Sequence, residues 1–268
     1  MLKMKTKVKT QNVIEIQNTS WKRQGKTILS NVNWEVKKGE HWAILGLNGS
    51  GKTTLLNMIN GYIWPSTGYV TVLEQKFGTT DLRELRKSIG WVSSSLQERM
   101  KQTAIAEDIV VSGKHSSIGI YEETTEEDYE KANQILEQLG ATHLIGRMYQ
   151  TCSQGERQKI LIARGLMGSP EVLILDEPTN GLDFISREEL LTTIQEMATL
   201  ENAPTILFVT HHIEEILPVF SHTLLLRKGT VFSKGRTENV LTSESLTAFF
   251  DLPVEITWKN SRAWMSMK

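Results

Sequence analysis

The sequence has little of what marks secreted, membrane-spanning or nucleic-acid-binding proteins. Its 268 residues include one cysteine, Cys152, so the chain cannot form an internal disulfide, which fits a reducing cytoplasm. Apolar runs such as Val172-Leu173-Ile174-Leu175 stop after four or five residues, far short of a membrane span. Thirty basic residues are balanced by thirty-one acidic ones, so no strongly basic surface predicts a nucleic acid partner. These absences favour a cytoplasmic chain, and its length allows one large domain or two small ones.

A glycine-rich loop is the most informative segment that is present. It matches the pattern G-x-x-x-x-G-K-[ST] at every fixed position, with the sequence Gly46-Leu47-Asn48-Gly49-Ser50-Gly51-Lys52-Thr53, followed by Thr54. Glycines let the backbone close around phosphates, so that successive N–H groups point at the negative charge. Lys52 would reach the β- and γ-phosphates, and Thr53 would place its hydroxyl on Mg²⁺. The loop therefore predicts binding of a nucleoside triphosphate with Mg²⁺.

The residues around this loop favour the context that its chemistry needs. Residues 42–45 are an apolar strand candidate that enters the loop, and residues 53–59 have the pattern of a helix that leaves it. The positive end of that helix would face the bound anion. Upstream, residues 13–40 alternate apolar and polar side chains, which predicts a small antiparallel sheet.

Helical patterns dominate residues 82–148. They are clearest over residues 124–139, where Thr124 and Glu127 predict a capping box and Gly140 predicts the end of the helix. Residues 254–267 form two alternating runs joined by polar residues, which predicts a C-terminal hairpin. We favour a structural cap for this hairpin over a binding site.

Two short apolar runs, residues 173–175 and 206–209, predict buried parallel strands. The first leads directly into Asp176 and Glu177. At the carboxyl end of a sheet strand, Asp176 can hold the metal ion and Glu177 can orient or deprotonate a water molecule. A solvated acidic turn is the alternative, but the position at the end of a strand favours a catalytic site.

Taken with the glycine-rich loop, further motifs make the chain similar to the ATP-binding cassette (ABC) ATPase family. These motifs are Cys152-Ser153-Gln154-Gly155-Glu156 before a helical run, Leu175-Asp176-Glu177-Pro178-Thr179-Asn180-Gly181-Leu182-Asp183, and Val209-Thr210-His211. The resemblance extends from about residue 13 to 239. It implies an α/β P-loop NTPase fold with a mostly parallel core sheet, an antiparallel β-subdomain and a helical subdomain inserted at about residues 97–150. The whole chain, residues 1–268, would then be one ATP-binding domain that ends in a hairpin at about 254–268.

The resemblance also implies roles for several residues. Ser153 and Gly155 match the family's signature motif, which receives the γ-phosphate bound on the opposing subunit. His211 takes the position of a switch histidine that touches the γ-phosphate, and we expect its neighbour His212 to be structural. Asp183 takes the position of a loop that contacts the partner's P-loop.

Trp21 falls where the family has an aromatic ring that stacks on adenine. A flat apolar ring suits this role because the base also presents a π-face. Packing in the core is the alternative role for this side chain.

The chain departs from the family pattern at two places. Ser94 stands where the family usually has a glutamine that contacts Mg²⁺ and water and senses the membrane partner. Gln97, three residues later, is the nearest amide that could replace it. Gln154 stands where the signature motif generally has its first glycine, although Ser153 and Gly155 are present.

We therefore expect a Mg²⁺-dependent ATPase in which Lys52, Glu177 and His211 are catalytic. Two copies would close head to tail on two ATP molecules and drive a separate transmembrane permease, with the ATPase peripheral on the inner face of the cell membrane. Residues 235–254 are similar to the carboxyl end of metal-chelate importer ATPases, which favours import. A non-transport ABC ATPase working on iron–sulfur assembly, translation or DNA is the alternative.

Overall fold

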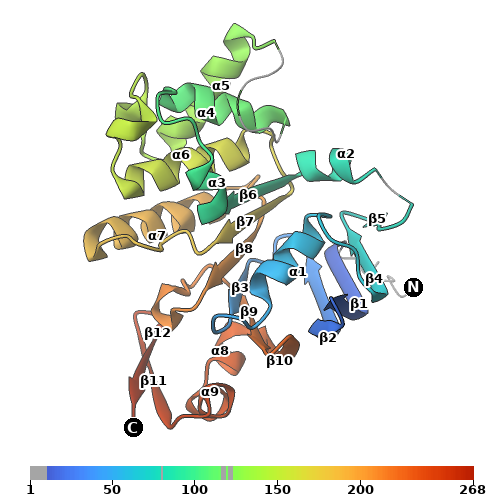
Figure 1. The fold of residues 1–268 in the computed structure, drawn as a ribbon. Coiled ribbons are helices and arrows are strands. Elements are labelled where there is room, and N and C mark those ends of the chain that lie inside the picture. Colours follow the sequence, from blue (N-terminus) through green and yellow to red (C-terminus); the bar gives the residue numbers. More distant parts are fainter. Residues whose placement is uncertain (1–10, 80, 116–118, 120–122) are drawn as a thin grey trace, which may run out of the picture.

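A six-stranded, mostly parallel sheet separates the two main layers of the molecule (Figure 1). The structure, a computed structural model, describes residues 11–79, 81–115, 119 and 123–268. The strand order is β10-β9-β3-β8-β7-β6, and every neighbouring pair is parallel except β10 with β9. The strands of this sheet are β3 (Trp42–Leu45), β6 (Ile89–Ser93), β7 (Val172–Asp176), β8 (Thr205–Thr210), β9 (His222–Arg227) and β10 (Thr230–Arg236).

Both faces of the central strands are buried, as the apolar runs predicted. Alternate residues of β7 enter different hydrophobic clusters, because successive side chains of a strand point to opposite faces. Leu173 and Leu175 pack in the cluster that also contains the helical layer. Val172 and Ile174 pack in the cluster shared with α1 and the antiparallel sheet. The predicted strands at residues 173–175 and 206–209 are therefore confirmed as β7 and β8.

An antiparallel sheet with the order β2-β1-β4-β5 covers one side of the molecule together with α1 (Figure 1). The prediction of an antiparallel sheet over residues 13–40 is confirmed, since β1 and β2 pair along their whole length. The predicted strand and helix on either side of the glycine-rich loop are confirmed as β3 and α1. The elements of this layer are β1 (Asn12–Arg23), β2 (Lys26–Lys37), α1 (Lys52–Ile59), β4 (Thr67–Val72), β5 (Gln75–Lys76) and α2 (Leu82–Lys87).

Between β6 and β7 the chain forms the helical part of the molecule (green to yellow in Figure 1). The fold is thus the predicted α/β cassette, in which a helical insertion interrupts the parallel sheet. The elements are the helices α3 (Ser94–Glu98), α4 (Ala106–Val111), α5 (Glu126–Gln138) and α6 (Gln154–Leu166) and the 3₁₀ turns η1 (Ser112–His115), η2 (Thr142–Leu144) and η3 (Tyr149–Thr151).

The helical reading of residues 82–148 is wrong at one point, where β6 interrupts the helices. Residues Ile89–Ser93 form a parallel ladder with Val172–Asp176. A strand this short depends on its partner, which lies about eighty residues away in the sequence. The local pattern therefore could not reveal it.

The start of α5 lies one residue later than predicted. The capping box is formed by Thr125 and Asp128, not by Thr124 and Glu127. Asp128 also forms an ion pair with Lys114, with 2.8 Å between nitrogen and oxygen. This tertiary contact favours Asp128 in the capping position. Gly140 follows the helix in a left-handed conformation (φ +61°), as predicted.

Glycines allow unusually close contact between α6, β6 and η1. A Cβ atom on Gly90 would lie 2.4 Å from the carbonyl oxygen of Gly165, and one on Gly113 would lie 2.0 Å from that of Arg164. No larger residue fits at these positions without moving backbone atoms. The carboxyl end of α6 is thus held directly against the strand that leads to Ser94.

The carboxyl end of the chain forms a hairpin that projects from the body of the molecule (Figure 1), which confirms the predicted hairpin. Arg262 joins it to two other segments. Its guanidinium is bidentate to Glu188 (2.6 and 3.1 Å) and donates to the carbonyl oxygen of Glu214. The elements of this region are α7 (Phe184–Ala198), η4 (Ile213–Glu215), α8 (Thr237–Val240), α9 (Ser243–Phe250), β11 (Val254–Lys259) and β12 (Arg262–Met267).

Replacing Arg262 with alanine should lower the free energy of unfolding by about 1–3 kcal/mol, since charge-assisted hydrogen bonds are among the strong ones. The side chain is only 15 % exposed, so water would not fully replace the lost bonds. Thermal melts would measure the effect. Lys259, which pairs with Arg262 across the hairpin and is exposed, provides the control. Equal melting temperatures for Arg262→Ala and Lys259→Ala would contradict the role of Arg262 as an anchor.

Candidate functional site

The glycine-rich loop connects β3 to α1 and forms one wall of a cavity. Gly49 and Gly51 have left-handed backbone angles (φ +76° and +106°). A Cβ atom on Gly51 would lie 2.9 Å from a methyl carbon of Leu29, and one on Gly46 would lie 2.7 Å from the carbonyl oxygen of Leu226. The cavity has a volume of about 440 Å³ and is lined by Ile28, Asn48, Gly49, Ser50, Gly51, Lys52, Thr53, Thr54, Ser94, Asp176 and Glu177. It brings together the predicted phosphate-binding and carboxylate residues.

Lys52 and Glu177 line this cavity, and His211 approaches Glu177 from an adjoining smaller pocket. The Lys52 ammonium donates to the carbonyl oxygen of Gly46 at 2.7 Å and lies 3.4 Å from Glu177 Oε1. His211 Nδ1 lies 3.5 Å from the same carboxylate oxygen. Glu177 has a left-handed backbone (φ +50°), and its N–H donates to the carbonyl oxygen of Val209. This strained conformation holds the carboxylate between a cation and an imidazole, an arrangement suited to orienting water beside a phosphate.

Asp176 is the last residue of β7 and lines the same cavity. Burial raises the pKa of its carboxyl group, and neighbouring Glu177 raises that pKa further, to about 6, although Lys52 acts in the opposite direction. Two carboxylates beside one lysine leave negative charge that a divalent cation would balance. Mg²⁺ prefers oxygen ligands and is usually bound by one or two protein groups together with substrate phosphates and water. The Asp176 carboxylate and the Thr53 hydroxyl fit that requirement.

Asp176→Asn should stabilise the nucleotide-free protein at pH 8 by on the order of 1–3 kcal/mol. Because the folded pKa lies above the unfolded value of 3.8, the stability that Asp176 contributes is present below pH 3.8 and is lost as the pH rises through about 6. The melting temperatures of the variant and the parent should therefore converge as the pH falls toward 4. The further stabilisation by Mg²⁺ and ATP should be smaller in the variant. A pH-independent difference would contradict this account.

The structure brings Ser94, and not Gln97, to the cavity. Ser94 begins α3 directly after β6 and lines the cavity beside the glycine-rich loop. Gln97 is one turn farther along, where its side-chain oxygen accepts a hydrogen bond from Gln158 of α6 at 3.0 Å. Gln158 is almost fully buried, at 3 % exposed. In this conformation Gln97 therefore connects α3 to α6.

We accordingly expect Ser94→Ala to lower the rate of ATP hydrolysis roughly two- to tenfold, the size of one hydrogen bond to a reacting group. Gln97→Ala should change the rate less, because its amide is engaged outside the cavity. Ser95→Ala is the matched control, since the Ser95 hydroxyl contacts Ser93 and not the cavity. Steady-state ATPase assays would measure all three variants. A larger loss for Gln97→Ala than for Ser94→Ala would show that α3 rearranges when nucleotide binds.

Trp21 lies outside this cavity. It is partly buried on β1, opposite Leu29 of β2, and packs against the cluster that contains Trp34. Ile28, the neighbour of Leu29 in the sequence, does line the cavity. These contacts support the core-packing role, and stacking on adenine stays a prediction.

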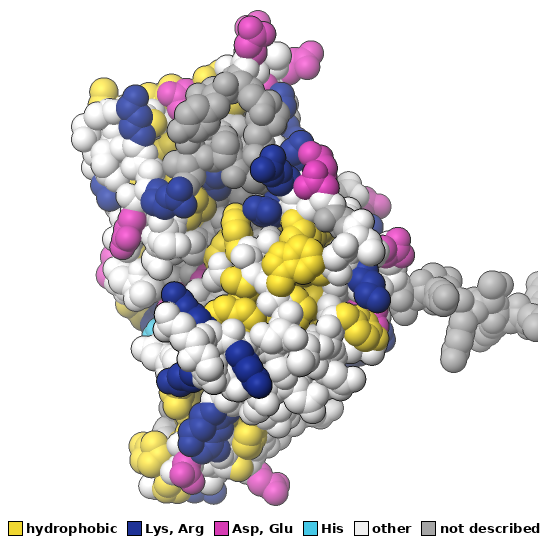
Figure 2. Space-filling view, turned by 45° about the vertical axis from the view of Figure 1, so that its right-hand side comes forward, with side chains coloured by type: hydrophobic (Ala, Val, Ile, Leu, Met, Phe, Trp, Pro, Cys, Tyr) yellow, Lys and Arg dark blue, Asp and Glu magenta, His cyan; other side chains and the backbone are white. Residues whose placement is uncertain are grey.

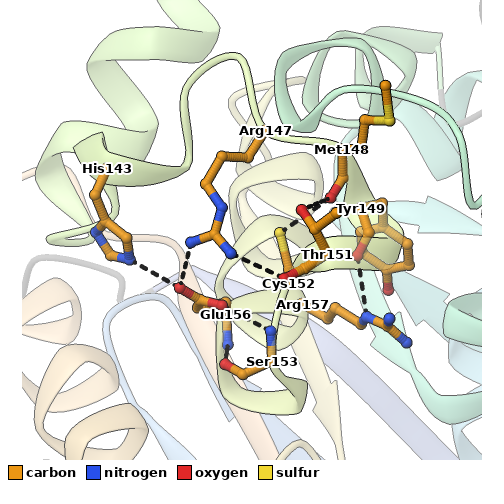
Figure 3. Close-up of polar contacts among 9 residues, drawn as sticks. All are labelled: His143, Arg147, Met148, Tyr149, Thr151, Cys152, Ser153, Glu156 and Arg157. Carbon is orange, nitrogen blue, oxygen red and sulfur yellow. Dashed lines mark hydrogen bonds and ion pairs between the residues drawn. The ribbon is translucent and has the colours of Figure 1, made fainter.

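Ser153 caps the start of α6 and forms a capping box with Glu156 (Figure 3). Its hydroxyl accepts a hydrogen bond from the Glu156 N–H at 3.3 Å, and the Glu156 carboxylate accepts one from the Ser153 N–H at 2.7 Å. The serine hydroxyl can therefore still donate its own proton outward. The Gln154 amide donates to the carbonyl oxygen of Asn180, in the loop after β7. This long side chain thus lies along a neighbouring loop.

Gly155 and Asp183 lie on either side of Ser186. A Cβ atom on Gly155 would be 3.3 Å from Ser186 Cβ, and Asp183 accepts hydrogen bonds from the N–H and the hydroxyl of Ser186. Ser153, Gly155 and Asp183 do not line the cavity at the glycine-rich loop. The chain thus carries two separate groups of predicted ATP-binding residues.

A second hollow lies on the other side of the β6–α3 junction. This groove has a volume of about 670 Å³, and Ser95, Leu96, Trp91 and Tyr62 are among its lining residues. Figure 2, which turns the α2 side of the molecule forward, shows a hydrophobic patch bordered by lysine and arginine side chains. Ser94 faces the nucleotide cavity, whereas the next two residues face the groove. One short segment therefore reaches both hollows.

Sequence reasoning missed several residues of these sites. Ile28 forms part of the cavity wall, and Arg147 and His143 contact Glu156. Ser153 and Glu156 match the S-x-x-E capping pattern, so Glu156 could have been found from the sequence. Arg147 and His143 have no comparable pattern, because their contacts depend on how η2 and η3 fold back onto α6.

Comparisons with known proteins agree with the geometry. A family model described as "ABC transporter" matches residues 29–180. The chain is 50 % identical to the uncharacterized ABC transporter ATP-binding protein YlmA of Bacillus subtilis, over 95 % of this chain and 97 % of that protein. It is 34 % identical to the molybdate import ATP-binding protein MolC of Haemophilus influenzae, over 90 % of this chain and 89 % of that protein. A solved structure of an inward-facing transporter assigned to the metal-chelate type superposes with a TM-score of 0.76 at 30 % identity, over 95 % of this chain and 96 % of that one.

Proposed function

The chain belongs to the ABC transporter family as an ATP-binding subunit, and from that premise we propose that it powers import through a separate membrane permease. The family implies ATP hydrolysis. In our proposal Mg²⁺ and ATP bind at the glycine-rich loop, and Glu177 orients or deprotonates the attacking water.

The β6–α3 junction is the observation that carries this proposal. Ser94 lines the nucleotide cavity, while Ser95 and Leu96 line the groove. A permease segment in the groove would therefore touch the same short helix that contacts bound nucleotide. The groove lining combines apolar side chains such as Trp91 and Leu96 with basic ones such as Arg99, and this mixture suits a short amphipathic segment of a partner protein. Among the described residues, no helix has the length and apolar composition to cross a membrane.

We further propose that two copies form a head-to-tail dimer around two ATP molecules. Ser153, Gly155 and Asp183 lie outside the chain's own cavity, which supports a role at the partner's nucleotide. Unpaired N–H groups at the start of a helix attract an anion such as a γ-phosphate. His211 would sense that phosphate in its own cavity through the contact with Glu177.

Import is the proposed direction because MolC is a molybdate import protein and the superposed structure is of metal-chelate type. In this proposal the subunit is peripheral on the cytoplasmic face of the membrane. It would bind there through the permease and not through lipid.

Site-specific crosslinking tests the proposal. Cys152, the one native cysteine, would be replaced by serine, and a single cysteine would be placed at Ser95 in the groove or at Glu201, an exposed residue after α7, as the control. In the native cells, a crosslinker at position 95 should capture a polytopic membrane protein, and the control should not. Full recovery of the protein in the soluble fraction without such a crosslink would favour a non-transport ABC ATPase.

A further inference from the structure

Glu156 is the centre of a small charge cluster at the start of α6 (Figure 3). Arg147 Nη1 lies 2.8 Å from Glu156 Oε1, and His143 Nε2 lies 3.1 Å from the same oxygen. The other carboxylate oxygen accepts the Ser153 N–H. Arg147 also donates to the carbonyl oxygen of Thr151, which fixes the guanidinium over the turn before α6. The cluster is thus joined through Glu156 to Ser153, the residue that caps α6.

This carboxylate poses an electrostatic problem for the proposed function. Partial burial would raise the pKa of Glu156, but hydrogen bonds from Ser153 and from Arg147 outweigh that effect and hold the pKa below its usual value. Glu156 is therefore ionised at neutral pH. A negative charge at the N-terminus of α6 would repel the γ-phosphate that Ser153 is proposed to receive.

We propose that Arg147 neutralises Glu156 so that the start of α6 can accept the phosphate bound on a second copy. This inference rests on the proposed head-to-tail dimer. Glu156 is needed to cap the helix, and Arg147 offsets the charge that this cap introduces. His143 adds a second contact, which carries positive charge only when the ring is protonated. Arg147 is thus a positioning residue that acts through Glu156 and need not touch the nucleotide.

Arg157 offers a matched comparison on the same helix. Its guanidinium donates to the carbonyl oxygens of Tyr149 (3.1 Å) and Gln150 (2.9 Å) and stacks on the Tyr149 ring. Arg157→Ala therefore removes the same charge as Arg147→Ala but leaves the ion pair between Arg147 and Glu156 in place. A general loss of positive charge would affect both variants, whereas the proposed neutralisation requires Arg147.

The test measures ATP-induced dimerisation by sedimentation in a Glu177→Gln background, where bound ATP is not consumed. Arg147→Ala should raise the ATP concentration needed for half-maximal dimer formation at least about tenfold, the effect of one uncompensated charge contact. Arg147→Lys should recover part of this loss. Adding Glu156→Gln to Arg147→Ala should restore dimerisation, because the amide oxygen can still cap Ser153 but carries no charge. Arg157→Ala should stay within about twofold of the background.

The outcomes separate the two proposals. Failure of Glu177→Gln alone to dimerise with ATP would overturn the head-to-tail dimer. Dimerisation of Glu177→Gln that Arg147→Ala leaves unchanged would overturn the role of Arg147. A defect in Arg147→Ala that Glu156→Gln does not relieve would also overturn it, because the contact with Thr151 would then explain the loss. Melting temperatures of each variant would confirm that all are folded.

Discussion

Glu177→Gln should reduce the turnover of ATP at least about a hundredfold, the usual scale for loss of a general base, while ATP affinity stays near that of the parent. The glutamine side chain has nearly the same shape and can still contact Lys52 and His211. It cannot accept a proton from water. ATP-bound dimers should therefore accumulate, and sedimentation with radiolabelled ATP would detect them.

Glu214→Gln is the control for this variant, because Glu214 follows His211 on the next turn but does not line the nucleotide cavity. Its rate should match that of the parent. If Glu177→Gln also hydrolysed ATP at the parent rate, the assignment of Glu177 would be wrong, and another group would have to activate the water.

Lys52→Ala should weaken ATP binding by about ten- to a hundredfold, since it removes charge-assisted hydrogen bonds to the phosphates. The rate of ATP hydrolysis should fall as well. The Lys52 side chain is buried, with 7 % of it exposed, and its ammonium contacts Gly46 and Glu177. It is therefore already aimed into the cavity. Fluorescent-nucleotide titration would give the change in affinity.

Lys259→Ala, in the C-terminal hairpin, removes the same charge from an exposed residue that does not line the cavity, and this variant should bind ATP like the parent. Melting curves without nucleotide would establish that Lys52→Ala is folded. Normal ATP affinity in a folded Lys52→Ala protein would contradict the phosphate-binding role.

Much of the fold follows from local sequence. The strand β3, the helix α1 and the buried strands β7 and β8 all have patterns that need only neighbouring residues to be recognised, and each of these predicted elements is confirmed. The resemblance to ABC ATPases is likewise confirmed by the family match and by the relatives. The carboxyl end of β7 brings Asp176 into the cavity because parallel strands present their carboxyl ends at one edge of the sheet.

What the sequence could not predict depends on contacts between distant residues. Arg262 and Glu188 are 74 residues apart, and Gln97 and Gln158 are 61 apart, so neither pair has a local pattern. The same reason explains two wrong predictions. The strand β6 forms because it pairs with the distant strand β7, and α5 starts one residue late because Asp128 pairs with Lys114. Geometry of this kind is fixed by packing and not by propensity.

The glycine contact at the far end of α6 has a mechanical consequence. This helix has 13 residues and spans about 20 Å. It is capped by Ser153, which we propose faces the partner's ATP, and its other end lies against the strand that leads to Ser94 beside the chain's own ATP site. Because backbone touches backbone at Gly90 and Gly165, no flexible side chain can absorb a shift of the helix. In a head-to-tail dimer, a shift at one end of α6 would therefore move the other end as well. The rate of hydrolysis at one nucleotide site would then depend on the nucleotide bound at the other.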